Sequence, residues 1–343
     1  MKKYLLPNEG DFYKANLHVH TTVSDGLFTP EEVKQGYKEH GYSVVAFTDH
    51  EVFVPHNDLT DDEFVAINSV ELSINDNWPA SFNYKKTYHL NLYALSDKQT
   101  ECVACTGSSV WLEQSKKYIS EFSKNNNFYK NYSINDVNSL IEKSNKDGFI
   151  VCYNHPVWSL QNYEDYAELK GLWGIEVYNT GSFRAGYEDT AQPFEDLLRK
   201  NEKLLPVCAD DSHNLNTSAY GGWTMIKAPA LNYNAILTAL KNGDIYSSTG
   251  PEINELYIEN GIVTIKTSNV KRIKLVTDIR YTKCARAVEG EYINEASFDI
   301  SSFIQEAQDK EINRRSLAWF RLEIIDESGK RAYTKGYFLN EIL

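Results

Sequence analysis

Side chains that bind metal ions recur along this chain from residue 18 to residue 213, near the ends of short apolar segments. The chain has 8 histidines, and all of them except His40 and His56 belong to this series, together with three carboxylates. Burying so many imidazoles without partners would be costly, so the series predicts one shared multi-metal centre rather than separate core histidines. Its members are His18, His20, Asp25, His50, Glu71, His89, His155, Asp211 and His213.

The segments that carry these residues alternate between strand and helix patterns. His18 and His20 share one face of a predicted strand at 15–20, because side chains repeat every two residues in a strand. Thr29 and Pro30 predict the start of a helix, and the apolar run 43–47 predicts a buried strand. This alternation is typical of an α/β fold, in which parallel strand ends meet at one face. Further strands are expected at 65–70, 88–94, 149–153, 173–178, 204–209 and 223–227, with helices at 109–124, 133–146, 186–200 and 232–242.

The pattern changes after Gly250 and Pro251. Short alternating segments separated by turns replace the strand-helix alternation, which predicts an antiparallel β-sandwich without a metal-ligand cluster of its own. We therefore expect two domains, at 1–250 and 251–343. The strands expected in the second domain are 255–259, 262–267, 273–277, 319–325 and 334–339.

The composition of the chain limits the classes of binding partner that we expect. The net charge of −13 makes a long nucleic acid a poor first guess, because such binding depends on Lys and Arg contacts to phosphates. A small anionic substrate remains open, since the charge of bound metal can outweigh the global balance. The first residues lack the apolar run of a signal peptide, no segment approaches the roughly 18 apolar residues of a membrane span, and the 5 cysteines have no framework spacing. These features predict a cytoplasmic protein with no membrane partner, and they indicate no oligomeric state.

The motifs, in order, resemble those of the PHP family, the polymerase and histidinol phosphatase metal-dependent phosphoesterases. The resemblance covers about residues 11–250 and implies a distorted (β/α)7 barrel of TIM-like type, followed here by the small all-β sandwich. The motifs that carry it are His18-x-His20 with Ser24-Asp25-Gly26, Thr48-Asp49-His50, the lone Glu71, His89, His155-Pro156 and Asp211-x-His213.

The same resemblance implies which residues hold which ion. His18, His20, Glu71 and Asp211 would hold a first metal. Glu71 would bridge to a second metal that His89 and His155 complete. Asp25, His50 and His213 would hold a third. Imidazole and carboxylate ligands suit zinc, manganese or iron, so we expect two or three divalent ions of one of these kinds. Asp210 is an alternative to Asp211, but the Asp-x-His spacing favours Asp211, and Asp49 is a candidate for supporting its neighbour His50.

The implied activity is hydrolysis of a small phosphomonoester, such as a nucleotide or sugar phosphate, by a hydroxide that bridges two metals. Glu71, Asp211 and His213 are the expected catalytic residues within the cluster. Arg184 follows a predicted strand end and is expected to contact phosphate, with a plain surface arginine as the alternative. Trp158 is a candidate for stacking on a ring of the substrate, although packing alone also explains a tryptophan there.

Two other functions stay open from the sequence. An amidohydrolase-type barrel that cleaves C–N bonds also begins with His-x-His, but it usually has a bridging lysine where Glu71 stands here. A non-catalytic binding module would use the metals only for stability, and would close every metal position with protein ligands. Assays on phosphate esters and on cyclic amides would separate the two enzymes.

Overall fold

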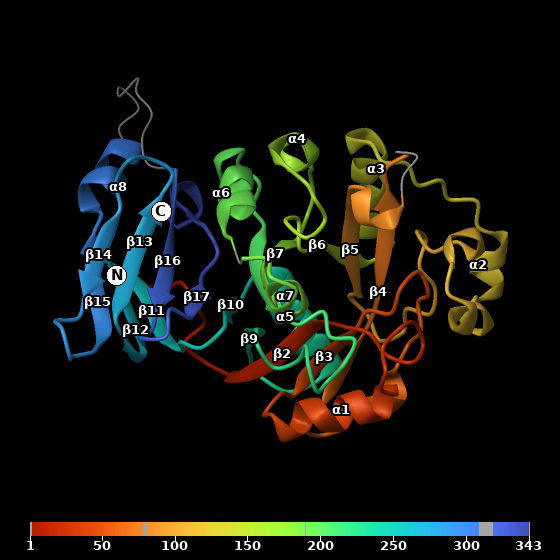
Figure 1. Ribbon diagram of the computed structural model, residues 1–343. Helices are drawn as coiled ribbons and strands as arrows, with labels where there is room; N and C mark the ends of the chain where they lie inside the picture. The colour runs from red at the N-terminus through yellow and green to blue at the C-terminus, as the bar shows by residue number, and fades with distance from the viewer. Residues whose placement is uncertain (1, 78–80, 189, 309–317, 343) are drawn as a thin grey trace.

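The strands of a central sheet of mixed direction, and the loops that follow them, carry the nine predicted metal ligands. The computed structural model describes residues 2–77, 81–188, 190–308 and 318–342 (Figure 1). Across the sheet the strand order is β10-β9-β2-β3-β4-β5-β6-β7-β8. The strands are β2 (Asp11–Val19), β3 (Val44–Phe47), β4 (Val65–Asn75), β5 (Thr87–Ala94), β6 (Phe149–Tyr153), β7 (Gly174–Asn179), β8 (Leu205–Ala209), β9 (Trp223–Ala228) and β10 (Ile245–Ser248).

Four pairs of neighbouring strands are parallel, namely β2 with β3, β3 with β4, β6 with β7, and β7 with β8. Strands β3, β6 and β8 are buried along their whole length, which explains their nearly continuous apolar sequences. The predicted α/β class is therefore confirmed. A closed barrel is not confirmed, because the ladder has an open order and β2 approaches the end of β8 through an isolated parallel bridge between Val19 and Ser212.

Helices pack around this sheet, and their starts follow local capping chemistry. Thr29 accepts a hydrogen bond from the backbone of Glu32, whose carboxylate accepts one from the backbone of Thr29 in return, so α1 begins where the sequence predicted. Asn232 caps α7 by accepting a hydrogen bond from the backbone of Ala235, at the start of the helix predicted at 232–242. The helices of this part are α1 (Pro30–Glu39), α2 (Glu121–Asn125), α3 (Ile134–Lys146), α4 (Tyr163–Tyr166), α5 (Thr180–Arg184), α6 (Gln192–Arg199) and α7 (Tyr233–Asn242).

Two strands, β5 and β9, run opposite to the parallel strands of the central sheet, and β9 is antiparallel to both β2 and β10. β5 is antiparallel to both β4 and β6, because β4 and β5 form a hairpin rather than a β-α-β crossover. The start of β5 therefore lies at the sheet edge where the parallel strands end. His89 is near that start, so the reversal is what brings it to the same edge as the other ligands.

One helix prediction was wrong, and another helix starts later than predicted. Instead of a helix at 109–124 the chain has the 3₁₀ turns η3 (Gly107–Ser109) and η4 (Glu113–Tyr118) before α2. Ser120 caps α2 by accepting from the backbone of Ser123, so a helix starts there anew. The helix expected at 186–200 begins only at Gln192, where Pro193 occupies the first turn.

The last part of the chain forms an all-antiparallel β region, as predicted. The sheet β1-β11-β12-β15 packs against β14-β13-β16-β17, and apolar residues such as Leu256 and Leu322 from the two sheets share one core. The strand expected at 334–339 is confirmed only in part, since 334–336 is irregular and the short strand β18 that pairs with β16 covers only Tyr337–Phe338. The elements are β11 (Ile253–Glu259), β12 (Ile262–Val270), β13 (Arg272–Thr277), β14 (Lys283–Arg286), β15 (Ile293–Asp299), α8 (Ser301–Gln308), β16 (Trp319–Ile325), β17 (Arg331–Tyr333), β18 (Tyr337–Phe338) and α9 (Leu339–Ile342).

Both ends of the α/β part are joined to this β region. The N-terminal strand β1 (Lys2–Tyr4) pairs with β11, and Figure 1 shows the chain start among the C-terminal strands. Strand β10 pairs with β17, so the central sheet continues into the second core. The division of the chain at residue 250 stays a prediction. None of the helices in the described ranges combines the length and the apolar character needed to cross a bilayer.

Candidate metal centre

All nine predicted ligands meet at one edge of the central sheet, although they come from six parts of the chain. Their potential ligand atoms fall into groups whose members lie within 4.8 Å of one another. His18 lies in β2, Glu71 in β4 and His89 in β5. The others lie in the loops that follow a strand: His20 and Asp25 after β2, His50 after β3, His155 after β6, and Asp211 and His213 after β8.

The first group consists of His18, His20, Glu71 and Asp211. Nε2 of His18 lies 3.2 Å from one oxygen each of Glu71 and Asp211. Nε2 of His20 lies 3.3 Å from Glu71 and 3.1 Å from Asp211. These four residues are the set that the resemblance assigned to the first metal.

The second group consists of Glu71, His89 and His155. Oε1 of Glu71 lies 3.1 Å from Nδ1 of His89, 3.5 Å from Nε2 of His155 and 3.2 Å from Nε2 of His18, whereas Oε2 faces His20 and His50. The two oxygens of Glu71 thus point to different histidines. This is the arrangement that a carboxylate shared between two cations requires.

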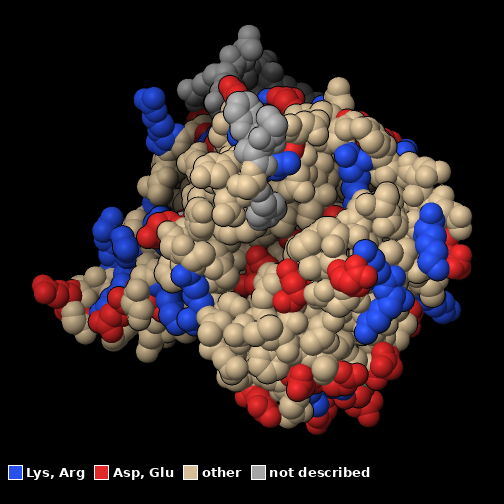
Figure 2. All heavy atoms as spheres, turned by 45° about the vertical axis from the view of Figure 1, so that its right-hand side comes forward, with Lys and Arg blue, Asp and Glu red and all other residues tan. Residues whose placement is uncertain are grey.

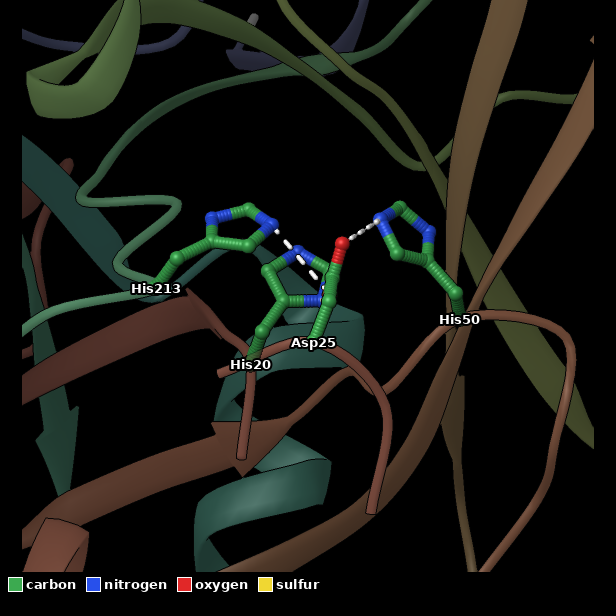
Figure 3. A group of neighbouring side chains, drawn as sticks. All are labelled: His20, Asp25, His50 and His213. Atoms are coloured by element: carbon green, nitrogen blue, oxygen red, sulfur yellow. Dashed lines mark ion pairs between the residues drawn. The ribbon is translucent and has the colours of Figure 1, made fainter. Parts of the chain in front are cut away.

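The third group adds His20 to the predicted set of Asp25, His50 and His213. Figure 3 shows the Asp25 carboxylate between the rings of His50 and His213, with His20 beside it. The Asp25 oxygens lie 3.4 Å from Nε2 of His213 and 3.8 Å from Nε2 of His50. The side chain of His213 is 39% exposed, so this group lies nearest to solvent.

Buried atoms without hydrogen-bond partners indicate that the cluster fits cations. Oδ1 of Asp25, Nδ1 of His50 and Oε2 of Glu71 are buried and make no hydrogen bond to any described residue. Burial and the neighbouring charge of His20 lower the pKa of His50 to about 3, which keeps its ring neutral as a ligand must be. Burial alone would raise the pKa of Glu71, but the charges of neighbouring histidines, His18 first among them, hold it well below its usual range. Lone pairs that face one shared space in this way suit divalent ions with nitrogen and oxygen ligands.

A further carboxylate, which the sequence analysis missed, supports the first and second groups. Oε1 of Glu176 in β7 accepts a hydrogen bond from Nδ1 of His18 at 2.7 Å, and Oε2 accepts one from the backbone of His155. Asn154 similarly donates to Oε1 of Glu71 at 2.8 Å. The available signal was a single charged residue inside the apolar strand β7. Such partners fix the ring orientation and tautomer of a ligand histidine.

The two neighbouring aspartates have separate tasks. Asp211 belongs to the first group and has a positive φ of 52°, a strained conformation that functional residues often keep. Asp210 is fully buried and points away from the cluster, where it accepts hydrogen bonds from Tyr37, Thr180 and the backbone of Tyr220. Burial raises the pKa of Asp210 even though these hydrogen bonds oppose the shift. The geometry thus supports Asp211, not Asp210, as the ligand.

Asp49 holds the loop that carries Asp25. Its carboxylate accepts hydrogen bonds from the backbone and hydroxyl groups of both Thr21 and Ser24. Gly26 follows in the same loop, and a Cβ at this position would lie 2.3 Å from the carbonyl oxygen of His20. Glycine is therefore required at position 26 of the Ser-Asp-Gly motif, because the backbone there passes close to the carbonyl group of His20.

Comparison with models of protein families identifies the family of this chain. A model of the PHP domain matches residues 16–210, more than half of the chain. The chain belongs to the PHP domain family. A search of the curated proteins found no match to the sequence.

Solved structures similar to this PHP chain have low identity to it. A two-domain protein from Bacteroides vulgatus, described as containing a proposed PHP-like metal-dependent phosphoesterase, is 15% identical with a TM-score of 0.46, and 98% of each chain is covered. A proposed metal-dependent phosphoesterase from Bifidobacterium adolescentis is 16% identical with a TM-score of 0.37, over 61% of this chain and 89% of that one. An amidohydrolase from Chromobacterium violaceum, solved with sulfate and no metal, is 15% identical with a TM-score of 0.39, over 67% of this chain and 96% of that one.

A cleft of about 530 Å³ opens beside the PHP ligand cluster. Seven of the nine ligands contribute to its wall, and the rest of the wall is formed by Ser73 and Asn75 of β4 and by two tryptophans, Trp111 and Trp158. Trp158, for which the sequence left stacking on a substrate and packing as alternatives, thus lines the cleft. Trp111 was missed, since it falls in the segment that was predicted as helix.

The structure does not bring Arg184 together with the PHP cluster. Its exposed side chain lines a different groove, together with His40 and Tyr220, and Arg184 is not among the residues of the cleft. Its catalytic role stays a prediction that this geometry does not support. The metal roles of the nine clustered residues also stay predictions, although all nine are in place for them.

Proposed function

We propose that this PHP-family chain hydrolyses a small phosphate ester at a site where the nine clustered residues hold two or three divalent ions. The observation that carries the proposal is the division of Glu71 between two sets of histidines, which suits neighbouring cations. When bound, such ions supply a nucleophile near neutral pH and neutralise charge on phosphoryl oxygens.

Neighbouring side chains hold the predicted ligands in a fixed orientation. Glu176 and Asn154 hold His18 and Glu71 in place, so little reorganisation is needed during reaction. In the overall reaction the oxygen of water forms a bond to phosphorus and the bond from phosphorus to the ester oxygen breaks. One proton of that water ends on the released alcohol. Ser73 and Asn75 are uncharged polar residues of the cleft wall within reach of such a substrate.

Two observations weigh against the alternative functions. No lysine lines the cleft among the described residues, whereas a C–N hydrolase of the amidohydrolase type would use a bridging lysine. The ligands also border an open cleft instead of being enclosed by protein, and a purely structural metal site does not need such access. The open cleft thus supports an enzyme rather than a structural metal site, and the missing lysine weighs against the amidohydrolase type.

The proposal is tested by measuring phosphate release and metal content in the same preparations. Glu71→Ala and His89→Ala should lower turnover of a model phosphomonoester by more than about 100-fold, because loss of outer partners alone typically costs 10–100-fold. Both variants should also bind less metal. His40→Ala is the matched control, since this exposed histidine lies outside the cluster. Turnover at the wild-type level in both cluster variants would refute the proposal, as would hydrolysis of cyclic amides but not of phosphate esters.

A further inference from the structure

The cleft beside the cluster has an unusual wall for a site that would take a phosphate ester. The described residues that line it include no lysine and no arginine. They include three of the predicted ligand carboxylates, Asp25, Glu71 and Asp211. On the face shown in Figure 2, acidic side chains lie in a hollow and gather again along the lower edge. Positive charge for the substrate must therefore come from bound metal. A second phosphate group, out of reach of the metals, would find only the neutral side chains of the wall, Ser73, Asn75 and the two tryptophans, and no cationic partner.

Two tryptophans form the apolar part of the wall and contact different parts of the cluster. The ring centre of Trp111 lies 5.8 Å from that of His50 in the third group. The ring centre of Trp158 lies 5.0 Å from that of His155 and 5.5 Å from that of His89 in the second group. Any ester whose phosphorus lies over the shared Glu71 thus has an aromatic surface within reach on either side.

Trp111 is held in place although it contributes little to the core. Its surface is 61% exposed. The neighbouring Val110 packs into a small apolar cluster with Val23 and Val52. Gln114 and Ser115 donate hydrogen bonds of 2.6 and 2.8 Å to the carbonyl oxygens of Ser24 and Val23. A large aromatic side chain that is left open to solvent, on a segment anchored on either side of it, is typical of a binding site rather than of core packing.

Trp158 is positioned by the turn that follows His155. The backbone N–H of Ser159 donates to the carbonyl oxygen of His155, and the Ser159 hydroxyl lies 3.2 Å from Nδ1 of the same histidine. The ring of Trp158 is half-buried, with part of its surface facing the cleft. Trp158 therefore lies in the same turn as the ligand His155. Trp111 lies in a segment that is hydrogen-bonded to the loop of the ligand Asp25.

We propose that the ester taken by this cleft has one phosphate group joined to a flat, uncharged aromatic group, and that Trp111 and Trp158 recognise the aromatic group. This inference rests on the function proposed above. Stacking gives the two tryptophans affinity for a planar ring, and the absence of cationic side chains gives selectivity against polyphosphates. Sugar phosphates, which are hydroxylated and not flat, fit the wall less well.

The test compares two substrates that differ only in the planarity of the ring. 2-Phenylethyl phosphate and 2-cyclohexylethyl phosphate have the same charge and similar leaving groups, so a difference in kcat/KM reports recognition of the ring. With manganese-loaded protein we expect a preference of roughly five- to twentyfold for the phenyl ester. Trp111→Leu and Trp158→Leu should each remove most of this preference, whereas Trp111→Phe should keep much of it. Phe122→Leu is the matched control, because Phe122 is exposed in the segment between β5 and β6 that also carries Trp111, and it does not line the cleft.

A binding measurement separates this inference from the proposed function. The affinities of 3-phenylpropylphosphonate and 3-cyclohexylpropylphosphonate, which are not hydrolysed, are measured by calorimetry on the same proteins. Tighter binding of the phenyl compound that is lost in the two Leu variants would support the inference, whether or not any ester is turned over. Absence of turnover would defeat only the proposed hydrolysis. Equal affinities for the two phosphonates, or no binding of either, would overturn the inference. Binding of 2-phenylethyl diphosphate as tight as that of the monophosphate would overturn its charge argument.

Discussion

The carboxylate of Glu176 accepts a hydrogen bond from Nδ1 of His18 at 2.7 Å, which leaves Nε2 of the same ring facing Glu71 and Asp211. Because this contact places the proton on Nδ1, it selects the tautomer whose Nε2 lone pair points into the first group of ligands. Glu176 also accepts from the backbone of His155, so one carboxylate positions residues of two groups.

Removing this support should weaken the cluster without removing a predicted ligand from it. We expect Glu176→Ala to lower the affinity for manganese or zinc by about 10- to 100-fold, as is typical for partners of ligand histidines. Glu176→Gln keeps an oxygen that can accept from Nδ1 and should lose less. Metal titrations of both variants, with circular dichroism as a check on folding, measure the effect. Identical affinity in the wild type and in Glu176→Ala would show that this contact does not position His18.

Asp210 and Asp211 provide a matched pair of adjacent substitutions. Asp210→Asn replaces an acceptor-only group with one that places N–H donors against Tyr37, Thr180 and backbone donors. We expect it to lower the free energy of unfolding of the metal-free protein by about 3 kcal/mol. Asp211→Asn should lower metal affinity more than stability. Urea unfolding in the presence of a chelator, combined with metal titration, separates the two effects, and the reverse pattern would mean that Asp210 is the ligand.

The positions of the clustered residues were predictable because chemistry and spacing coincide in the sequence. Histidine and carboxylate motifs that follow apolar strands leave few other interpretations once they occur in series, and the structure brings all nine together. Glu176 and Trp111 were not predictable in this way. A lone glutamate in the apolar strand β7 has no spacing signature, and the role of Trp111 depends on contacts of its loop with Val23 and Ser24, far away in the sequence.

The fold shows the same distinction between local and long-range causes. Capping by Thr29 and the apolar run of β3 are local, and both predictions were confirmed. The reversed direction of β5 was not predictable, since the apolar pattern of a buried strand is the same for either direction. Likewise, η4 replaces a helix because Gln114 and Ser115 hydrogen-bond to another segment, which helical periodicity cannot reveal.

Metal binding should release protons. Burial alone would lower the pKa of His20, but hydrogen bonds and charges from Asp211 and Glu71 raise it to about 10 in the metal-free cluster. The ring is therefore protonated at neutral pH and must lose its proton when a cation binds. We expect metal affinity to rise with pH from about 6 to 9, by about tenfold per pH unit for each proton released. Calorimetry in buffers of different ionisation enthalpy measures this release, and a titration without any released proton would contradict the expectation.

The loop that carries Asp25 should be sensitive to a single methyl group. In Gly26→Ala the new Cβ would lie 2.3 Å from the carbonyl oxygen of His20, so the loop must shift and take Asp25 with it. We expect the variant to bind fewer ions per chain, with the third group losing its ion and the first two groups keeping theirs. Gly186→Ala is a control for backbone strain away from the cluster, since alanine is strained at its φ of +96° but nothing lies within 4 Å of a Cβ there. Unchanged metal content in Gly26→Ala would mean that Asp25 is not needed as a ligand.

The central claim is that nine side chains from separate segments hold divalent ions around Glu71. Crystals of the protein grown with manganese, measured for anomalous scattering at the manganese absorption edge, test this most directly. The account predicts strong anomalous peaks among the three groups, with at least two of them in contact with the Glu71 carboxylate. Well-ordered crystals that show no anomalous peak within reach of Glu71, His18 and His89 would contradict it.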